Sequence, residues 1–321
     1  MKDIYEMLNL QLFAEPNTQT TGTGTLSDEM KTYYSDYLID NAVPKLVHDQ
    51  FGQKHPIPKN GGKTIEFRKY SPLPKLLTPL TEGVTPDGQS LTVTTIEATV
   101  DQYGGYVTIA DMLQLTAIDN NMVQATKLLG NQAGASLDTI TREVLNGGTN
   151  VIYAGGVASR SALTAEHKLT VDDIKKAVRA LKTQNAEKIG DSFVAIIHPD
   201  VTYDLTNDPT WQAVKDYDPK DWYEGEIGKI AGVRFVETTE AKIFEGGVYS
   251  TLILGDNAYG VTEIEGGGLE HIVKQLGSAG TADALNQRAS VGWKATKVAE
   301  RLVEQFMVRI ESKCTFNGAA N

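Results

Sequence analysis

Residues 59–70, KNGGKTIEFRKY, contain the Gly-Gly-Lys-Thr that ends a phosphate-binding P-loop. The complete motif, G-x-x-x-x-G-K-[ST], also needs an earlier glycine, and Ile57 occupies that position. After Thr64, apolar and charged residues alternate. This alternation predicts a strand, whereas a P-loop continues into a helix whose free N–H groups bind phosphate. We therefore expect no nucleotide site here, and we predict that Lys63 and Thr64 open a strand.

His198 precedes Asp200 by two residues, a spacing that a general base and its orienting carboxylate can use. A His-Pro-Asp after an apolar strand more often ends that strand and caps the next element, and we predict that role. No serine lies in the G-x-S-x-G motif of hydrolases. The other histidines stand far apart and give zinc no ligand set: His48, His55, His167 and His271. The sequence thus predicts no catalytic residues, no metal and no cofactor.

Residues 215–228, KDYDPKDWYEGEIG, carry alternating aspartates like those of a calcium-binding loop. Such a loop beginning at Asp216 needs glycine at position 221 and glutamate at position 227, where Asp221 and Ile227 stand. We interpret the segment as a solvated acidic loop. The glycines in GEIGKIAG lack the spacing of a dinucleotide-binding loop and precede a strand, so they predict turns.

Composition and charge narrow the class of protein. The chain has 321 residues, of which 40% are hydrophobic and 22% are charged, as in ordinary globular proteins. Its single cysteine, Cys314, excludes an internal disulfide. The formal net charge of -11 opposes binding of a nucleic-acid backbone by the whole surface. Residues 1–15 fit neither a secretory signal nor a membrane span.

The order of expected helices and strands shows no regular βαβ alternation, so we predict an α+β fold. Residues 16–25 are rich in Thr and Gly and predict an extended arm. Residues 26–51 show a helical pattern that Pro44 should kink. A long helix with one apolar stripe is predicted over 122–146. A capping box of Thr170 and Asp173 predicts a second helix, and strands and turns dominate after it. The closing segment RASVGWKATKVAERLVEQFMVRIES is β-like, although VAERLVEQF is also compatible with a helix.

Residues 59–104 predict a long β-hairpin whose arms are separated by the Pro- and Leu-rich tip SPLPKLLTPLTEGVTPDG. Its charges are segregated, because residues 59–75 are mainly basic and residues 76–104 carry only acidic charges. Two interpretations remain open. The arms pair and neutralise each other locally, or the projecting hairpin docks on another copy of the chain. The candidate interface residues are Arg68, Lys69, Lys75, Glu82 and Asp87.

The arrangement of arm, hairpin, long helix and strand-rich region resembles a tailed-bacteriophage major capsid protein. The chain also resembles one capsid family of that lineage in the local sequence of five segments: LNLQLFAE, GKTIEFRKYSPLPKLLTPLTEG, GEIGKIAGVRFVET, LGDNAYGV and NQRASVGWKA. The resemblance covers most of the chain in order. It implies the capsid fold shared by tailed phages and herpesviruses, which has an N-terminal arm, an extended loop, a peripheral domain with a spine helix, and an axial domain.

The resemblance also implies where these parts lie. The arm and first helix would occupy residues 1–58, the extended loop 59–104, and the peripheral domain with its spine helix 105–189. The axial domain would occupy residues 190–281, and residues 282–321 would return to the peripheral domain.

The implied function is structural: self-assembly, through hexamers and pentamers, into an icosahedral shell that encloses phage double-stranded DNA. Expected partners are other copies of the chain and scaffold, portal or decoration proteins, with no membrane and no sequence-specific DNA contact. The implied location is the virion, after assembly in the host cytoplasm. We also expect the subunit to stay uncleaved and free of isopeptide cross-links. The alternatives are the shell subunit of an encapsulin-like nanocompartment and an enzyme with a dispersed active site.

Overall fold

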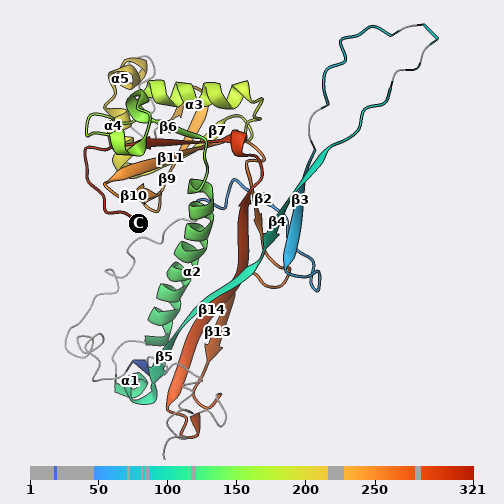
Figure 1. The fold of residues 1–321 in the computed structure, drawn as a ribbon. Helices are drawn as coiled ribbons and strands as arrows, with labels where there is room; N and C mark the ends of the chain where they lie inside the picture. The colour runs from blue at the N-terminus through green and yellow to red at the C-terminus, as the bar shows by residue number, and fades with distance from the viewer. Residues whose placement is uncertain are drawn as a thin grey trace, which may run out of the picture. The chain divides into compact units, whose positions relative to one another are not determined.

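The computed structural model describes residues 18–19, 47–70, 73–80, 82–83, 85, 87–116, 121–215, 228–278 and 283–321 (Figure 1). The chain forms two compact units. Unit 1 comprises Met1–Val43, Tyr103–Ala133 and Leu269–Ala295, and unit 2 comprises Pro44–Gln102, Gly134–Gly268 and Thr296–Asn321. Within the described ranges, no helix has the length and apolar character needed to cross a membrane.

Unit 1 is built on long strands. These are β1 (Thr18–Gln19), most of β5 (Asp101–Ala110), β13 (Glu270–Lys274) and the first part of β14 (Arg288–Arg301). β1 runs parallel to β5, and β13 runs antiparallel to β14. A Cβ atom added to Gly292 would lie 2.8 Å from the Cβ of Tyr106, so only glycine allows this close approach of β14 and β5. A small core of Ile109, Leu113 and Ala125 joins β5 to α1 (Asp111–Thr116) and to the first turns of α2 (Asn121–Asn146).

Unit 2 contains a seven-stranded sheet with the order β6-β15-β11-β7-β9-β8, in which β10 also pairs with β11. The strands are β6 (Val151–Tyr153), β7 (Phe193–Ile197), β8 (Lys229–Ile230), β9 (Val233–Glu237), β10 (Ile243–Phe244), β11 (Val248–Leu254) and β15 (Met307–Ser312). Every residue of β7 and β11 is buried, as expected for central strands covered on both faces. The core of this sheet includes residues of α3 (Val171–Thr183) and α4 (Pro199–Thr206), and Trp211 of α5 (Pro209–Lys215).

Two predicted helix starts are confirmed. The side chain of Thr170 accepts a hydrogen bond from the Asp173 N–H at 3.3 Å, and this caps α3. The side chain of His198 accepts from the Asp200 N–H at 3.1 Å, so His198 ends β7 and caps α4. The expected turn in GEIGKIAG is also present, because Ala231 and Gly232 have positive φ between β8 and β9.

The remaining strands of unit 2 include the two strands of a hairpin. β12 (Tyr259–Thr262) pairs with the end of β14 and with β2 (Gln53–Lys54), and the hairpin strands are β3 (Thr64–Tyr70) and β4 (Val93–Thr99). β3 begins at Thr64, where the sequence predicted a strand in place of the helix of a P-loop. Three short 3-10 turns complete the described elements: η2 (Ala154–Gly156), η3 (Arg160–Ala162) and η5 (Glu304–Phe306).

The predicted mixture of α and β structure is confirmed, with differences of detail. The helix expected over 26–51 does not extend through 47–51, which form turns, and its earlier part lies outside the described residues. The closing segment is a strand to Arg301 followed by the turn η5, so a helix over VAERLVEQF is wrong. The acidic loop at 216–227 lies outside the described residues.

The helix predicted over 122–146 is confirmed as α2, but its burial changes along its length. Ala125, Leu129 and Ala133 are buried, as the apolar stripe predicted. In the second half the stripe is only partly buried, whereas four polar residues are buried there: Asp138, Thr141, Arg142 and Asn146. The cause is a set of hydrogen bonds to distant segments that the periodicity of one helix cannot reveal.

The seven-stranded sheet and its core combine segments from three of the predicted parts of the chain. α3 was assigned to residues 105–189, yet it packs in the same core as β7 and β11. β15 was assigned to the return segment 282–321, yet it pairs with β11 and β6. The division into peripheral and axial domains remains a prediction.

Candidate subunit interface

The hairpin of β3 and β4 is antiparallel, from the pair Thr64 and Thr99 to the pair Tyr70 and Val93 (Figure 1). Because side chains alternate along a strand, Ile65 and Phe67 lie on one face of the hairpin and Glu66 and Arg68 on the other. The described residues between Tyr70 and Val93, which we call the hairpin tip, continue away from the paired strands in Figure 1. The hairpin thus projects one polar and one partly apolar face.

The base of the hairpin is held by an aromatic contact. The ring of Phe67 meets that of His55 at 5.8 Å between centroids, in an edge-to-face arrangement. A Cβ atom placed on Gly260 would lie 3.0 Å from two ring carbons of Phe67, so a side chain at residue 260 would press on the ring. These contacts hold the start of β3 against β12 within unit 2.

A groove of about 540 Å³ lies beside this contact, and we call it the hairpin-base groove. Its lining combines aliphatic residues with two cations and one acid: Ile65, Ile96, Leu302, Val303, Arg68, Lys69 and Glu66. Arg68 and Lys69 are both exposed. The groove can therefore accept an apolar group, and its charged side chains have both signs.

The hairpin tip exposes an unusual amount of apolar surface. Its leucines have exposed fractions of 51% (Leu73), 78% (Leu76), 85% (Leu77), 76% (Leu80) and 67% (Leu91). The sequence marks the tip as Leu-rich, but these residues were not among the predicted interface candidates. Clustered leucines that no part of their own unit covers mark a surface for a partner. The sequence signal that could have identified them is the high density of leucines between prolines, in a segment that is too short to form a hydrophobic core of its own.

The five predicted interface residues fall into two groups. Arg68 and Lys69 lie on β3 beside the groove, whereas Lys75, Glu82 and Asp87 lie in the hairpin tip, and all five are exposed. The structure does not bring the two groups together within one chain. Their role at an interface remains a prediction.

The register of the hairpin does not neutralise the two cations across its arms. Arg68 stands opposite Thr95 and Lys69 opposite Thr94. The nearest ion pair of Arg68 is with Glu66 on the same strand, at 3.6 Å, with side chains 65% and 49% exposed. Such exposed pairs contribute little. Glu66 itself stands opposite Glu97, so acidic charge faces acidic charge across the arms. The arms do pair, but their register places no acidic residue directly opposite Arg68 or Lys69.

A buried polar network holds the segment that leads into the hairpin. The His48 N–H donates to Asp138 Oδ1 at 2.8 Å, and the Tyr259 hydroxyl donates to the His48 carbonyl. The next residue, Asp49, accepts from Thr141 Oγ1 at 2.5 Å and pairs with Lys297. These bonds explain why α2 buries Asp138 and Thr141, because each of the two has a partner in this network.

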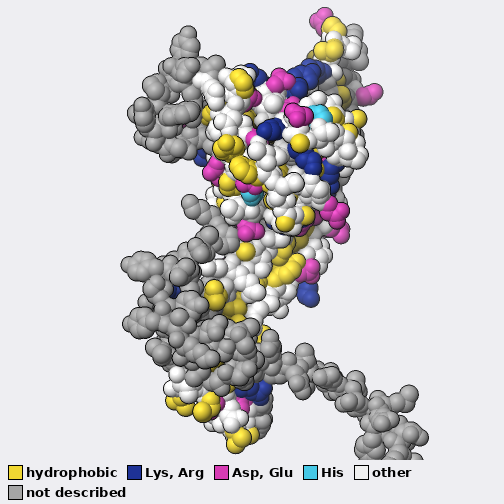
Figure 2. Space-filling model, turned by 90° about the vertical axis from the view of Figure 1, so that its left-hand side faces the viewer, with side chains coloured by type: hydrophobic (Ala, Val, Ile, Leu, Met, Phe, Trp, Pro, Cys, Tyr) yellow, Lys and Arg dark blue, Asp and Glu magenta, His cyan; other side chains and the backbone are white. Residues whose placement is uncertain are grey.

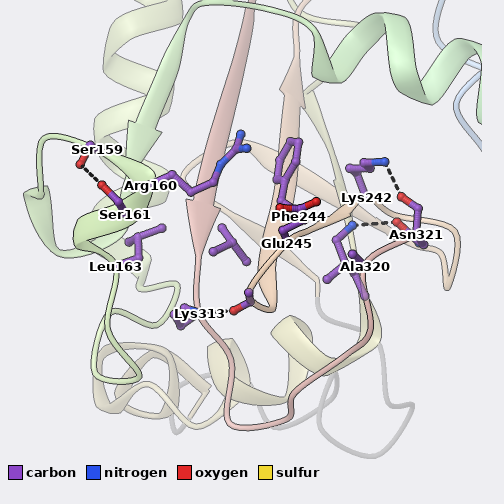
Figure 3. Close-up of a pocket in the computed structure, with 13 residues that line it drawn as sticks. Ser159, Arg160, Ser161, Leu163, Lys242, Phe244, Glu245, Lys313, Ala320 and Asn321 are labelled. Atoms are coloured by element: carbon purple, nitrogen blue, oxygen red, sulfur yellow. Dashed lines mark hydrogen bonds between the residues drawn. The ribbon is translucent and has the colours of Figure 1, made fainter.

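A larger hollow, of about 980 Å³, lies beside β10 and the last residues of the chain (Figure 3). Arg160 lies over the ring of Phe244 at 3.6 Å and donates to both oxygens of the fully buried Glu311, at 2.6 and 2.7 Å. The hydrogen bond with Glu311 raises the pKa of Arg160. The other two cations of the hollow bond to the Asn321 and Gly246 carbonyls: Lys242 and Lys313. The cations of the hollow thus have partners within the chain. The bond from Lys242 to the Asn321 carbonyl ties the C-terminal segment to the sheet.

Within the described part of the chain, no group of three or more His, Cys, Asp or Glu residues is placed to hold a metal ion. The single thiol, Cys314, is buried, and its pKa is raised to about 12 by burial and by the hydrogen bond with Asp204. It is therefore protonated at neutral pH and a poor nucleophile. On the face shown in Figure 2, basic and acidic side chains are interspersed. The hairpin, with its groove and its tip, is the candidate functional surface.

Comparison with known proteins identifies the family. Residues 93–302 match the family described as phage capsid protein. No curated protein matches the chain. Among solved structures, the capsid of Cyanophage P-SCSP1u is 15% identical with a TM-score of 0.69, covering 92% of this chain and 96% of that one.

Two further structures share the fold. The capsid of Ralstonia phage GP4 is 14% identical, with a TM-score of 0.67, and covers 90% of this chain and 96% of that one. The SrpI encapsulin of Synechococcus elongatus PCC 7942 is 9% identical, with a TM-score of 0.56, and covers 92% of this chain and 98% of that one. The encapsulin is the more distant of these relatives. Because the family match spans more than half of its length, the chain belongs to the phage capsid protein family, and its role is structural.

Proposed function

We propose that copies of this chain assemble, as hexamers and pentamers, into the closed icosahedral head shell of a tailed phage, which encloses double-stranded DNA. The observation that carries the proposal is the projecting hairpin, whose tip leucines are 51% to 85% exposed. A lone subunit leaves this apolar surface in water, whereas a shell can bury it at every subunit contact. The role is that of a complementary surface, and no catalysis is part of it.

The net charge of the subunit supports a shell that encloses DNA without binding it tightly. A subunit with a formal net charge of -11 repels the phosphate backbone over most of its surface. DNA is then retained by closure of the shell, with no sequence-specific contact. Scaffold, portal and decoration proteins are the further partners of such a shell, and the host cytoplasm is its place of assembly.

Electron microscopy of the purified protein tests the proposal. Closed shells of uniform diameter are the expected result, and particles isolated from an infection should contain DNA that nuclease cannot reach. A protein that stays monomeric at all concentrations, with or without a co-expressed scaffold, would contradict it.

The fold shared with the SrpI encapsulin gives a second candidate, a nanocompartment shell subunit. The two candidates differ in their contents. An encapsulin-like shell would hold a co-purifying cargo protein and no DNA, and mass spectrometry of intact particles together with nuclease-protected DNA measurement separates them.

A further inference from the structure

The hollow beside β10 contains an arginine whose positive charge is only partly neutralised. The fully buried carboxylate of Glu311 accepts from Arg160 at 2.6 and 2.7 Å, and Nε of Arg309 lies 2.9 Å from the same carboxylate. One negative charge thus stands between two guanidinium groups, which leaves one positive charge in excess. The side chain of Arg309 is 9% exposed and that of Arg160 is 40% exposed, so the excess charge is accessible at Arg160.

Arg160 is also held in a fixed orientation with unused hydrogen-bond donors. Its Nε and Nη2 donate to Glu311, whereas no described acceptor bonds to its Nη1. The ring of Phe244 supports the guanidinium group at 3.6 Å from the ring centroid. A guanidinium group that is fixed in this way loses little entropy when a carboxylate binds to its free N–H groups.

Lys313 provides a second positive charge on the lining of the hollow. Its ammonium group donates to the Gly246 carbonyl, and an ammonium group has more N–H donors than this one bond uses. In Figure 3, Leu163 lies between Arg160 and Lys313. The lining therefore places apolar surface between two positive charges.

The other charged groups of the hollow are less available. The ammonium group of Lys242 is shared between Glu143, at 3.0 Å, and the Asn321 carbonyl. Glu245 is the one acid among the described lining residues, and it is exposed. With three cations and one acid, the lining as a whole is positive.

We propose that this hollow binds an acidic peptide segment of a partner protein, in which an apolar side chain lies between two carboxylates. One carboxylate bonds to Arg160 and the other to Lys313, while the apolar side chain contacts Leu163 and Val248. Recognition of acidic motifs by arginine is a recurring way of binding peptides. A volume of about 980 Å³ exceeds the need of one inorganic anion, and cations at separate places on the lining favour an extended ligand.

Fluorescence anisotropy measures the binding to purified full-length protein. The probes are the labelled peptides Ser-Glu-Leu-Glu-Ser and Ser-Glu-Leu-Leu-Glu-Ser, whose different lengths allow for the span between the two cations. Counterparts with glutamine in place of glutamate should bind about tenfold more weakly or worse, because they lack the charges. The formal net charge of -11 gives the subunit no general attraction for acidic peptides, so binding reports a local site.

Charge changes on the lining test the two ends of the site. Lys313→Glu should weaken binding about tenfold or more, and Lys313→Arg, its matched control, should bind like the wild type. Arg160 is retained because its loss would unpair the buried carboxylate of Glu311. Instead, Ser161→Glu adds an acid to the lining and should weaken binding to a similar degree. Lys188→Glu, at an exposed position outside the lining, changes the net charge equally and should have no effect.

Hydrogen exchange locates the bound peptide, and circular dichroism shows whether each variant is folded. The glutamate peptides should slow amide exchange in residues 159–163 and 243–248, which contribute to the lining, and leave exchange in α3 unchanged. Protection of α3 alone would place the peptide elsewhere and overturn the proposal.

Three further results would also overturn it: no binding of either glutamate peptide, equal binding of the glutamine counterparts, or wild-type binding by both Lys313→Glu and Ser161→Glu. Full displacement of the peptide by inorganic phosphate at the same concentration would show a site for a free anion and would contradict the peptide as ligand. None of these measurements depends on assembly. Their failure therefore leaves the proposed shell untouched, and absence of shells would leave this inference standing.

Discussion

His48 Nδ1 lies 2.7 Å from Asp138 Oδ2, and both side chains are 1% exposed. The peptide N–H of His48 donates to the other oxygen of the same carboxylate at 2.8 Å. One buried carboxylate therefore holds both the backbone and the ring of the residue that precedes β2 and the hairpin. This pair fixes the turn at 47–50 on the second half of α2.

Replacing Asp138 with alanine should lower the free energy of unfolding by about 3–5 kcal/mol, because it leaves buried donors of His48 without an acceptor. Urea denaturation of the unassembled subunit measures the change. The exposed Asp191→Ala serves as the control and should change stability by no more than about 0.5 kcal/mol. Equal effects of the two substitutions would contradict the structural role of the buried pair.

Gly260→Ala should loosen the base of the hairpin. The new methyl group would lie 3.0 Å from the ring of Phe67, and relieving this overlap costs roughly 1–3 kcal/mol. We expect faster amide hydrogen exchange in β3 and β4, while the seven-stranded sheet keeps its protection. Gly268→Ala is a matched control, since its added Cβ is 3.6 Å from the nearest atom. Unchanged exchange in the hairpin would show that Phe67 does not depend on this contact.

Tyr249→Phe should release the C-terminal segment. The buried Tyr249 hydroxyl donates to Asp200 Oδ2 at 2.7 Å and accepts from the Gly318 N–H at 2.8 Å. Losing both bonds should destabilise the subunit by about 1–3 kcal/mol and speed proteolysis after Thr315. Limited digestion followed by mass spectrometry measures the rate. The 65% exposed Tyr106 provides a control, since Tyr106→Phe should digest like the wild type.

Stability should decrease on the acid side because of His198. Burial lowers the pKa of His198 below its ordinary value of 6.5, although the charges of Asp200 and Glu237 oppose this shift. The unfolded chain therefore binds the proton at a higher pH than the folded chain does. The contribution of the neutral His198 ring to the stability of the folded subunit is complete above about pH 6.5. It is lost as the pH falls through the lowered folded-state pKa.

The variant His198→Asn keeps a residue that caps helices well but does not titrate. Between pH 7.5 and pH 5.5, we expect its Tm to decrease by roughly 2 °C less than that of the wild type. Thermal unfolding followed by circular dichroism provides the measurement, and the other titrating groups are common to both proteins. Identical acid-side slopes would rule out His198 as a source of the pH dependence.

Local signals in the sequence were sufficient for several elements. The capping residues Thr170 and His198 predicted where α3 and α4 begin, because a cap bonds to N–H groups only two or three residues away. The apolar period predicted α2 over almost its full length. The order of arm, hairpin, helix and strands was also enough to indicate the family. The charges of the candidate interface could be read in the same way, since Arg68, Lys69, Glu82 and Asp87 lie within one segment.

Tertiary structure decided which distant segments meet. The pairing of β15 with β6 and the burial of Asp138 depend on partners far away in the chain. The periodicity of a helix or a strand describes neighbouring residues only and carries no information about such partners. The register that places Thr95 opposite Arg68 was equally hidden, because a long tip does not fix register as a two-residue turn does. The sequence by itself determined the local elements and the segregation of charge. Only the fold determined that the hairpin leaves its cations without acidic partners across the arms and its leucines in water, because register and burial are properties of packed neighbours.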